Sequence, residues 1–264
     1  MKPFIKWAGG KRWLTAEPTF EFPDFSGRYI EPFLGGGAVF FHTKPAEAIL
    51  SDVNPRLIEV YQTIRDDWQR VLKELRRLQR LHCKAFYYEE RGRKRTTPHT
   101  RTAQFLYLNR TCFNGLYREN LKGEFNVPIG TKDKIIFEDE DFGEISRILS
   151  VAEIRAADFS ETISEATDGD LVFADPPYTT AHNMNGFVKY NQNIFSWEDQ
   201  VRLREVVLQA VDRGARVVLT NADHESIRQL YDLHGTYRPI GRASVMAGKS
   251  AFRANTTEAL YVFE

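Results

Sequence analysis

The residues best suited to chemistry form one short run, Asp175-Pro176-Pro177-Tyr178, directly after the apolar segment 171–174. The apolar segment is typical of a buried strand, and the two prolines fix φ in the turn that follows it. The Asp175 carboxylate and the Pro176 carbonyl could both accept hydrogen bonds from an exocyclic amine, while the Tyr178 ring could stack on a flat base. The run therefore indicates a site that grips an amino-bearing base, although a strand followed by a rigid surface turn would contain the same residues.

Acidic residues also stand at the ends of other predicted strands. Asp52 follows a short apolar strand at 48–50, where nucleotide-binding α/β folds present an acidic side chain to ribose hydroxyls. Asp158 and Phe159 follow a strand at 153–156, just as Asp175 follows the strand at 171–174. Because ligands of open α/β sheets bind outside the carboxyl ends of the strands, these side chains are predicted to line one ligand site.

Two glycine-rich turns complete the candidate site. Phe33, Gly35 and Gly37 lie between a strand at 28–33 and a helix that begins at 38, where glycine lets backbone approach a ligand closely. This turn lacks the G-x-G-x-x-G spacing of dinucleotide binders, which disfavours a nucleotide-binding oxidoreductase. The second turn is Lys6-Trp7-Ala8-Gly9-Gly10-Lys11. It is either an N-terminal arm packed by Trp7 or a clamp over a ligand, in which Lys11 would face a carboxylate as a point charge.

The elements that must position these residues follow an α/β pattern interrupted by a mainly helical, basic insertion. Asn54-Pro55 supplies the N-cap and first-turn proline of a helix to about residue 81. Residues 88–102 are predicted to form a loop, 103–108 a helix, and 109–130 a hairpin with loops. A capped helix opens at Ser196, and strands follow at 216–220 and 258–263. We predict a catalytic domain at 1–54 and 142–264 around an inserted domain at 55–141.

Composition excludes several classes of protein. The chain has 264 residues, 42% of them apolar, which suffices for one large domain or one domain with an insertion. It has no apolar run of about 18 residues and no signal-like N-terminus, so a cytoplasmic protein without membrane contact is expected. Two cysteines and six scattered histidines give neither a metal spacing nor a disulfide framework. No exposed apolar repeat suggests an oligomer, so a monomer without an obligate protein partner is expected.

The charge distribution favours a polyanionic partner. The net charge is zero, but residues 65–118 contain 14 Lys and Arg against 5 Asp and Glu, while the remaining chain contains 22 against 31. A basic segment in an otherwise acidic protein is expected where a protein contacts a phosphate backbone. A solvated helix face with a charged loop would give the same count.

Four segments in this order resemble the Dam-type DNA adenine-N6 methyltransferases of the alpha group. They are 6–11, Glu31-Pro32-Phe33-Leu34-Gly35-Gly36-Gly37, Ser51-Asp52-Val53-Asn54 and the run at 175–178. Segments 108–118 and 123–130 are similar to the DNA-reading hairpin of enzymes that methylate adenine in GATC. The resemblance spans nearly the whole chain. It implies a Rossmann-like sheet, double-stranded DNA as substrate and a bacterial or phage-infected bacterial cell.

The resemblance also implies S-adenosylmethionine as cofactor, with S-adenosylhomocysteine as product and no metal. Trp7, Ala8, Gly9 and Lys11 would line its methionine end, and Phe33, Gly35 and Gly37 would let backbone pass beneath it. Asp52 would take the ribose hydroxyls, and Asp158 with Phe159 would hold its adenine. The run Asp175, Pro176, Pro177 and Tyr178 would hold the target adenine after it has flipped out of the duplex.

For DNA, the resemblance implies a set of readers within and near the hairpin. Arg118 could donate two hydrogen bonds to one guanine and Lys6 could reach another. Leu116 and Pro128 could contact a thymine methyl, and Phe113 could wedge into the base stack. The full set of DNA-binding candidates is Lys6, Arg91, Arg95, Arg110, Phe113, Asn114, Leu116, Arg118, Asn126 and Pro128. Arg91, Arg93, Lys94 and Arg95 are either phosphate contacts or solvated loop charges.

Some alternatives stay open at this point. Cys112 and Phe113 fill variable positions of related hairpins, and Ile129 replaces a more usual aromatic residue, so relaxed or different specificity is one alternative. Cytosine N4 is disfavoured because Asp175 stands where such enzymes often have serine. A catalytically silent DNA-binding relative is disfavoured by the intact Lys11, Asp52, Asp175 and Tyr178. The composition of residues 179–193 suggests a loop that closes over the target base.

Overall fold

The six predicted strands, together with one at 236–243 that was not predicted, form a mixed sheet of seven in the computed structural model, which describes residues 1–17, 20–120, 122–181, 195–243 and 255–264. In chain order these are β1 (Tyr29–Glu31), β2 (Ala48–Asp52), β3 (Ala152–Ala156), β4 (Leu171–Ala174), β5 (Arg216–Ala222), β6 (Thr236–Ala243) and β7 (Asn255–Phe263). Hydrogen-bonded neighbours follow the order β3-β2-β1-β4-β5-β7-β6. β1 pairs in parallel with β2 and β4, and β4 with β5, whereas β7 runs antiparallel between β5 and β6. The α/β, Rossmann-like class is confirmed.

The chain packs as two compact units. Unit 1 contains Met1–Ala16, Gly35–Lys44 and Asn54–Ala156, and unit 2 contains Glu17–Leu34, Pro45–Val53 and Ala157–Glu264. The expected insertion at 55–141 lies wholly in unit 1, which also takes the N-terminal arm and the segment up to Ala156. These units therefore divide the chain differently from the two domains predicted from the sequence.

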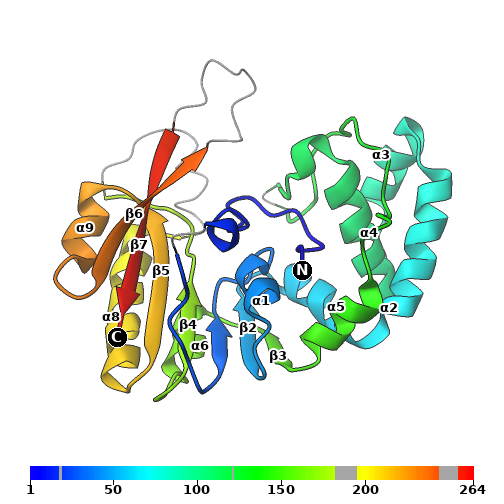
Figure 1. Ribbon diagram of the computed structural model, residues 1–264. Coiled ribbons are helices and arrows are strands. Elements are labelled where there is room, and N and C mark those ends of the chain that lie inside the picture. The colour runs from blue at the N-terminus through cyan, green and yellow to red at the C-terminus, as the bar shows by residue number, and fades with distance from the viewer. Residues whose placement is uncertain (18–19, 121, 182–194, 244–254) are drawn as a thin grey trace. The chain divides into compact units, whose positions relative to one another are not determined.

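Unit 2 carries the sheet edge that matters for the site. Its helices are α6 (Phe159–Ser164), α8 (Trp197–Asp212) and α9 (Glu225–Tyr231), and α6 packs with α8 against the sheet (Figure 1). The predicted cap of α8 is present as a capping box: the Asp199 N–H donates to Ser196 Oγ at 3.1 Å, and the Ser196 N–H donates to Asp199 Oδ2 at 2.9 Å. Ile163, Leu203 and Val217 belong to the core between these helices and the strands.

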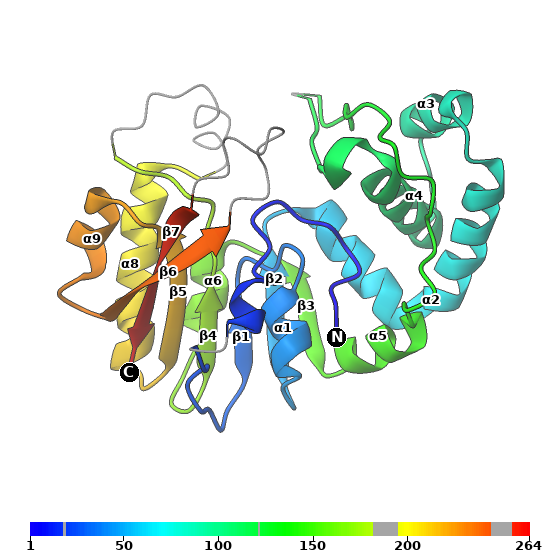
Figure 2. The same ribbon diagram turned by 45° about the horizontal axis from the view of Figure 1, so that its top comes forward.

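Unit 1 is mainly helical. It contains η1 (Leu14–Ala16), α1 (Ala38–Thr43), α2 (Pro55–Leu81), α3 (Lys84–Gly92), α4 (Pro98–Thr111), η2 (Phe113–Gly115) and α5 (Phe142–Leu149). The long helix α2 packs along α4 and α5 (Figure 2). It begins as predicted, with Pro55 in the first turn and Asn54 Oδ1 accepting from the Arg56 and Leu57 N–H groups.

The prediction of a loop at 88–102 holds only for residues 93–97, because α3 ends only at Gly92 and α4 begins at Pro98. Cys83 caps α3 through its sulfur, which accepts from the Phe86 N–H, and a proline in the first turn starts α4. Three of the arginines that suggested a loop, Arg93, Arg95 and Arg101, form ion pairs, and Glu90 is fully buried against Arg95. The predicted hairpin is present in reduced form, as single bridges Cys112↔Ile129 and Glu119↔Phe125.

Two further predictions concern the closing loop at 179–193 and contact with a membrane. Most of the predicted closing loop at 179–193 lies outside the described residues, since description stops at residue 181 and resumes at 195. Within the described ranges, no helix combines the length and apolarity needed to cross a membrane.

Candidate functional site

The carboxyl ends of β1, β2 and β4 bring the acidic and aromatic candidates of unit 2 to one edge of the sheet. β1 pairs in parallel with both β2 and β4, so the residues that follow these three strands emerge on the same side. Phe33 follows β1, Asp52 is the last residue of β2, and Asp175 directly follows β4. This placement agrees with the rule for ligand sites in open α/β sheets.

An aromatic stack stands beside the acidic strand ends. The Phe33 and Phe159 rings stack with centroids 5.3 Å apart and 26° between their planes. Phe195 packs edge-on against Phe33 at 5.7 Å, and Phe159 is almost fully buried. The pair therefore forms a rigid apolar wall of the kind that a flat ring can contact.

The Asp158 carboxylate accepts hydrogen bonds from Ser160 and Arg202. Its Oδ1 accepts from the Ser160 N–H at 2.9 Å and from Arg202 Nη1 at 2.7 Å, while Oδ2 accepts from Arg202 Nη2 at 3.0 Å. Burial by itself would raise the pKa of Asp158, but the hydrogen bonds from Arg202 and Ser160 lower it below the usual range. The Arg202 guanidinium also lies 4.2 Å from the Phe159 ring centroid. Asp158 thus caps α6 and orders the wall in its ionised form.

The run at 175–178 is held by residues of the neighbouring strands. Thr220 Oγ1, fully buried on β5, donates to Asp175 Oδ1 at 2.7 Å. The Tyr178 hydroxyl donates to Oε2 of Glu258 on β7 at 2.6 Å. Burial and the carboxylates of Asp175 and Glu258 raise the pKa of the Tyr178 hydroxyl, so it remains protonated at neutral pH. Sequence reasoning missed Thr220 and Glu258.

A second layer fixes the backbone after the run. Gln200 Nε2 donates to the Thr179 carbonyl at 3.3 Å, and Asn221 Nδ2 donates to Gln200 Oε1 at 3.0 Å. Thr179 Oγ1 donates to the Phe195 carbonyl at 2.8 Å. Since all of these side chains are buried, the turn after β4 is a built structure and not a surface loop.

The remaining cofactor candidates belong to unit 1, in the N-terminal arm and the turn before α1. Lys11 is buried, and its Nζ donates to the carbonyl of Gly9 at 2.9 Å. Gly35 has a φ of +46°, and a Cβ placed there would come within 2.7 Å of Trp7 Cδ1. The Tyr61 hydroxyl donates to the Gly35 carbonyl at 3.0 Å. Ala8 lies in the turn between Trp7 and Gly9, and Gly37 caps α1 with a φ of +64°. Trp7 and the glycine turn are therefore packed directly on each other, as a clamp or packed arm requires.

The predicted DNA readers in the hairpin are accessible in unit 1. Phe113 is 52% exposed, and Asn114 and Pro128 are exposed beside it. Asn114 has a φ of +56°, so the backbone turns sharply at the tip of η2. The exposed side chain of Arg118 donates through Nε to Asn126 Oδ1 at 2.8 Å. Asn126 thereby fixes the direction of the guanidinium from the other arm of the hairpin.

Two other DNA-reading candidates, one in the N-terminal arm and one in the hairpin, are only partly accessible. The side chains of Lys6 and Leu116 are half-buried. Burial and the charge of Lys132 lower the pKa of Lys6 from its usual value. Lys6 lies against the hairpin, since a Cβ placed at Gly115 would come within 2.6 Å of Lys6 Cδ.

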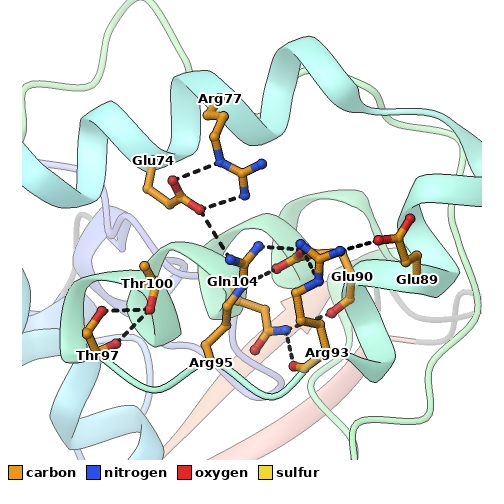
Figure 3. Close-up of polar contacts among 9 residues, drawn as sticks. All are labelled: Glu74, Arg77, Glu89, Glu90, Arg93, Arg95, Thr97, Thr100 and Gln104. Carbon is orange, nitrogen blue, oxygen red and sulfur yellow. Dashed lines mark hydrogen bonds and ion pairs between the residues drawn. The ribbon is translucent and has the colours of Figure 1, made fainter.

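Arg110 and Arg95 do not fit the role predicted for them, because both are occupied inside unit 1. Arg110 is 1% exposed and forms a bidentate ion pair with Glu140, at 2.8 Å and 2.6 Å. Arg95 donates to both carboxylate oxygens of the buried Glu90 and lies 3.6 Å from Glu74 (Figure 3). A guanidinium committed to buried carboxylates would have to break these pairs to reach a phosphate. Arg91 is half-buried and donates to the Val127 carbonyl at 3.2 Å, so it supports the hairpin.

Half of the 14 Lys and Arg side chains in the segment 65–118 are also engaged in ion pairs. Seven of its cations form ion pairs with carboxylates, namely Arg65, Arg70, Arg77, Arg93, Arg95, Arg101 and Arg110. Figure 3 shows three of them gathered with Glu74, Glu89 and Glu90 around the α3–α4 connection. Five of these pairs use the acidic residues of the same segment, which the count already includes. Only the pairs with Glu59 and Glu140 bring in carboxylates from outside, so the excess of nine positive charges (14 minus 5) falls by two, to seven.

Comparison with known proteins gives a consistent family. Residues 7–244 match the family described as D12 class N6 adenine-specific DNA methyltransferase. The chain is 35% identical over 267 residues to the type II methyltransferase M1.LlaDCHI of Lactococcus lactis subsp. cremoris, across 98% of this chain and 94% of that protein. It is 35% identical over 271 residues to the DNA adenine methylase of Serratia marcescens, across 98% of both proteins. It is 33% identical over 235 residues to the DNA adenine methylase of Escherichia coli K12, across 87% and 84%. The chain belongs to the D12 class of N6 adenine-specific, S-adenosylmethionine-dependent DNA methyltransferases.

Proposed function

We propose that the protein methylates N6 of adenine in the sequence GATC of double-stranded DNA, after the target base has flipped out of the duplex. The observation that carries the proposal is the built turn after β4, in which Thr220 and Glu258 hold Asp175 and Tyr178 at the carboxyl edge of the sheet. The Asp175 carboxylate accepts a hydrogen bond from the adenine amine and stabilises positive charge that builds on its nitrogen. The Tyr178 ring stacks on the base, and its neutral hydroxyl keeps the ring fixed against Glu258.

The residues present suit the cofactor of this family. Asp52 at the end of β2 offers a carboxylate for ribose hydroxyls, and the Phe33–Phe159 stack offers a wall for an adenine ring. In unit 1 the buried Lys11 offers a cation for the carboxylate of the methionine end, beside Trp7 and Gly9. When bound, S-adenosylmethionine supplies a reactive methyl group on a sulfonium centre. The Asp158 pair with Arg202 keeps the aromatic wall in place.

The GATC part of the proposal rests on the hairpin of unit 1. Its residues resemble the DNA-reading hairpin of GATC enzymes, and Phe113, Arg118 and Pro128 are exposed on it. Flipping a base costs a few kcal/mol of pairing and stacking. Phe113 would offset part of this cost by filling the space beside the departing base.

The direct test is to incubate the purified protein with S-adenosylmethionine and DNA that lacks adenine methylation, and to map N6-methyladenine by site. Methylation confined to GATC supports both parts of the proposal. Methylation at other adenines keeps the chemistry and removes the specificity. A folded protein that binds cofactor but leaves DNA unmethylated would favour a silent DNA-binding relative.

Arg118→Ala is expected to weaken recognition of one guanine by about 1–3 kcal/mol while leaving the fold intact. The side chain is exposed and held by Asn126, so its removal deletes a base contact without opening a cavity. The measurement is kcat/KM on GATC duplexes and on duplexes with a single substitution at each position. An equal loss on all duplexes would instead make Arg118 a phosphate contact.

Thr220→Val is expected to lower kcat by about 10- to 100-fold with little change in KM for DNA, because Asp175 loses the donor that orients it. Thr63→Val is a matched control, since Thr63 Oγ1 also makes a part-buried hydrogen bond, to the Glu59 carbonyl within α2. Single-turnover methylation rates of both variants decide the matter. Equal rates for the two variants would show that Thr220 has no positioning role.

A further inference from the structure

One buried amide side chain near the end of α4 holds two segments that are far apart in the sequence. Asn109 Oδ1 accepts from the Lys6 N–H at 2.9 Å, and Asn109 Nδ2 donates to the Lys6 carbonyl at 2.8 Å. The same Nδ2 donates to the Gly115 carbonyl at 3.3 Å. Asn109 is 0% exposed. It therefore pairs with both peptide groups of Lys6, as a neighbouring strand would, and also binds the start of the hairpin.

The two segments also contact each other directly. Gly115 has a φ of +67°, and a Cβ placed there would lie 2.6 Å from Lys6 Cδ and 3.2 Å from the Asn109 carbonyl oxygen. Only glycine fits this backbone conformation and this close approach without strain. The Trp7 ring stacks on Tyr117, with centroids 5.5 Å apart and 24° between planes. Residue by residue, the arm at 6–7 thus lies against the hairpin at 115–117.

We propose that Asn109 is a positioning residue that couples cofactor binding to DNA reading. The inference rests on the proposed function, because it takes residues 7–11 as part of the cofactor site and residues 113–128 as the base-reading hairpin. A cofactor held by Trp7 and Lys11 restrains the arm, and the Asn109 amide transmits that restraint to Gly115. Leu116 and Arg118 follow Gly115 in the same arm of the hairpin. When cofactor binding orders the N-terminal arm, it therefore also orders the base-reading residues Leu116 and Arg118.

Thermodynamic reciprocity makes the proposal quantitative. If bound cofactor raises the affinity for DNA by some factor, bound DNA must raise the affinity for cofactor by the same factor. If Asn109 had only a structural role, its replacement would lower the affinity for both ligands or the stability of the fold. It would leave this coupling factor unchanged. The coupling factor is thus the quantity that separates a positioning role from a stabilising one.

The experiment measures the dissociation constants of the full-length protein for S-adenosylhomocysteine and for an unmethylated duplex that contains the target sequence. Each constant is measured with and without the other ligand. The wild type is expected to show coupling within the usual range of about 5- to 150-fold. Asn109→Asp keeps the acceptor for the Lys6 N–H but places an oxygen against the Lys6 and Gly115 carbonyls. Its coupling factor is expected to fall to within about twofold of unity.

Two further variants guard the interpretation. Gly115→Ala disturbs the same contact from the hairpin side and is expected to lose coupling as well, which keeps the test valid if Asn109→Asp does not fold. Thr111→Val is the matched control, because the buried Thr111 hydroxyl donates only within α4, to the Tyr107 carbonyl at 2.7 Å. It is expected to keep the wild-type coupling factor.

The outcomes distinguish this inference from the proposed function. A wild type that methylates DNA but shows no coupling, or folded Asn109→Asp and Gly115→Ala variants that keep it, would overturn the inference alone. Loss of coupling in Thr111→Val to the same degree would also overturn it, since any disturbance of α4 would then suffice. A wild type that neither binds nor methylates duplex DNA would overturn the proposed function itself.

Discussion

Replacing Asp175 with alanine is expected to reduce methyl transfer by about 10³-fold or more, because the reacting amine loses its charged hydrogen-bond acceptor. Asp175 follows β4 and takes a hydrogen bond from the buried Thr220 hydroxyl at 2.7 Å. The carboxylate is therefore oriented before any base arrives. The measurement is the single-turnover rate at saturating cofactor and DNA.

Stability must be separated from chemistry in this variant. Alanine leaves the Thr220 hydroxyl without its acceptor, which costs about 1–3 kcal/mol in a buried setting. Asp175→Asn is the matched control. Its amide oxygen still accepts from Thr220, whereas its NH2 group is a donor and cannot accept a hydrogen bond from the amine of the base. We expect Asp175→Asn to unfold at nearly the wild-type temperature and still to be almost inactive. An asparagine variant with more than a small fraction of wild-type rate would remove Asp175 from its proposed role.

Local sequence signals predicted the frame of the site well. Asn54-Pro55 and the Ser196-to-Asp199 capping box begin their helices as expected, because caps depend on residues within one turn. The apolar run before Asp175 forms β4, and the acidic strand ends of β2 and β4 share one sheet edge. In each case the decisive interaction is local, or follows from a general rule of parallel sheets.

Thr220 and Glu258 could not be paired with the tetrapeptide from the sequence. They lie 45 positions from Asp175 and 80 from Tyr178, and meet them only because β5 pairs with β4 and β7 with β5. One signal was available: Thr220 and Asn221 are polar residues at the end of an apolar strand, as Asp52 is. The rule that singled out Asp52 would have singled them out too.

Charge and periodicity misled the prediction at α4, where a helix was expected only at 103–108 and Arg110 was taken as a DNA-binding candidate. Nearly every residue from Thr102 to Thr111 is buried, so the helix has no polar face that would mark its phase in the sequence. Arg110 therefore resembles a basic residue of a DNA-reading motif. Burial on all sides of a helix, and the Glu140 partner 30 residues away, are tertiary features.

Arg110→Ala is consequently expected to act on stability and not on sequence reading. The guanidinium donates to Glu140 through both Nη atoms, and also to the Ile135 carbonyl at 2.6 Å and the Phe4 carbonyl at 3.0 Å. Removing one partner of a buried ion pair costs about 3–5 kcal/mol, because the other charge remains buried. For a chain of this size that corresponds to a fall of about 6 to 20 °C in the unfolding temperature. Arg118→Ala, which removes an exposed arginine, is the control and should stay within about 0.5 kcal/mol of wild type.

The pH dependence of this loss identifies Glu140 as its cause. Burial raises the pKa of Glu140 above its usual value even with Arg110 in place, and removing the guanidinium takes away the main influence that lowers it. A carboxyl whose pKa is raised by folding favours the folded state at low pH, and that contribution is lost as the pH rises through the folded-state pKa. The stability difference between Arg110→Ala and wild type should therefore shrink as the pH falls towards the ordinary glutamate value of 4.5. Thermal unfolding between mildly acidic and neutral pH tests this, and a difference that does not vary with pH would place the cost elsewhere, in the lost contacts to Ile135 and Phe4.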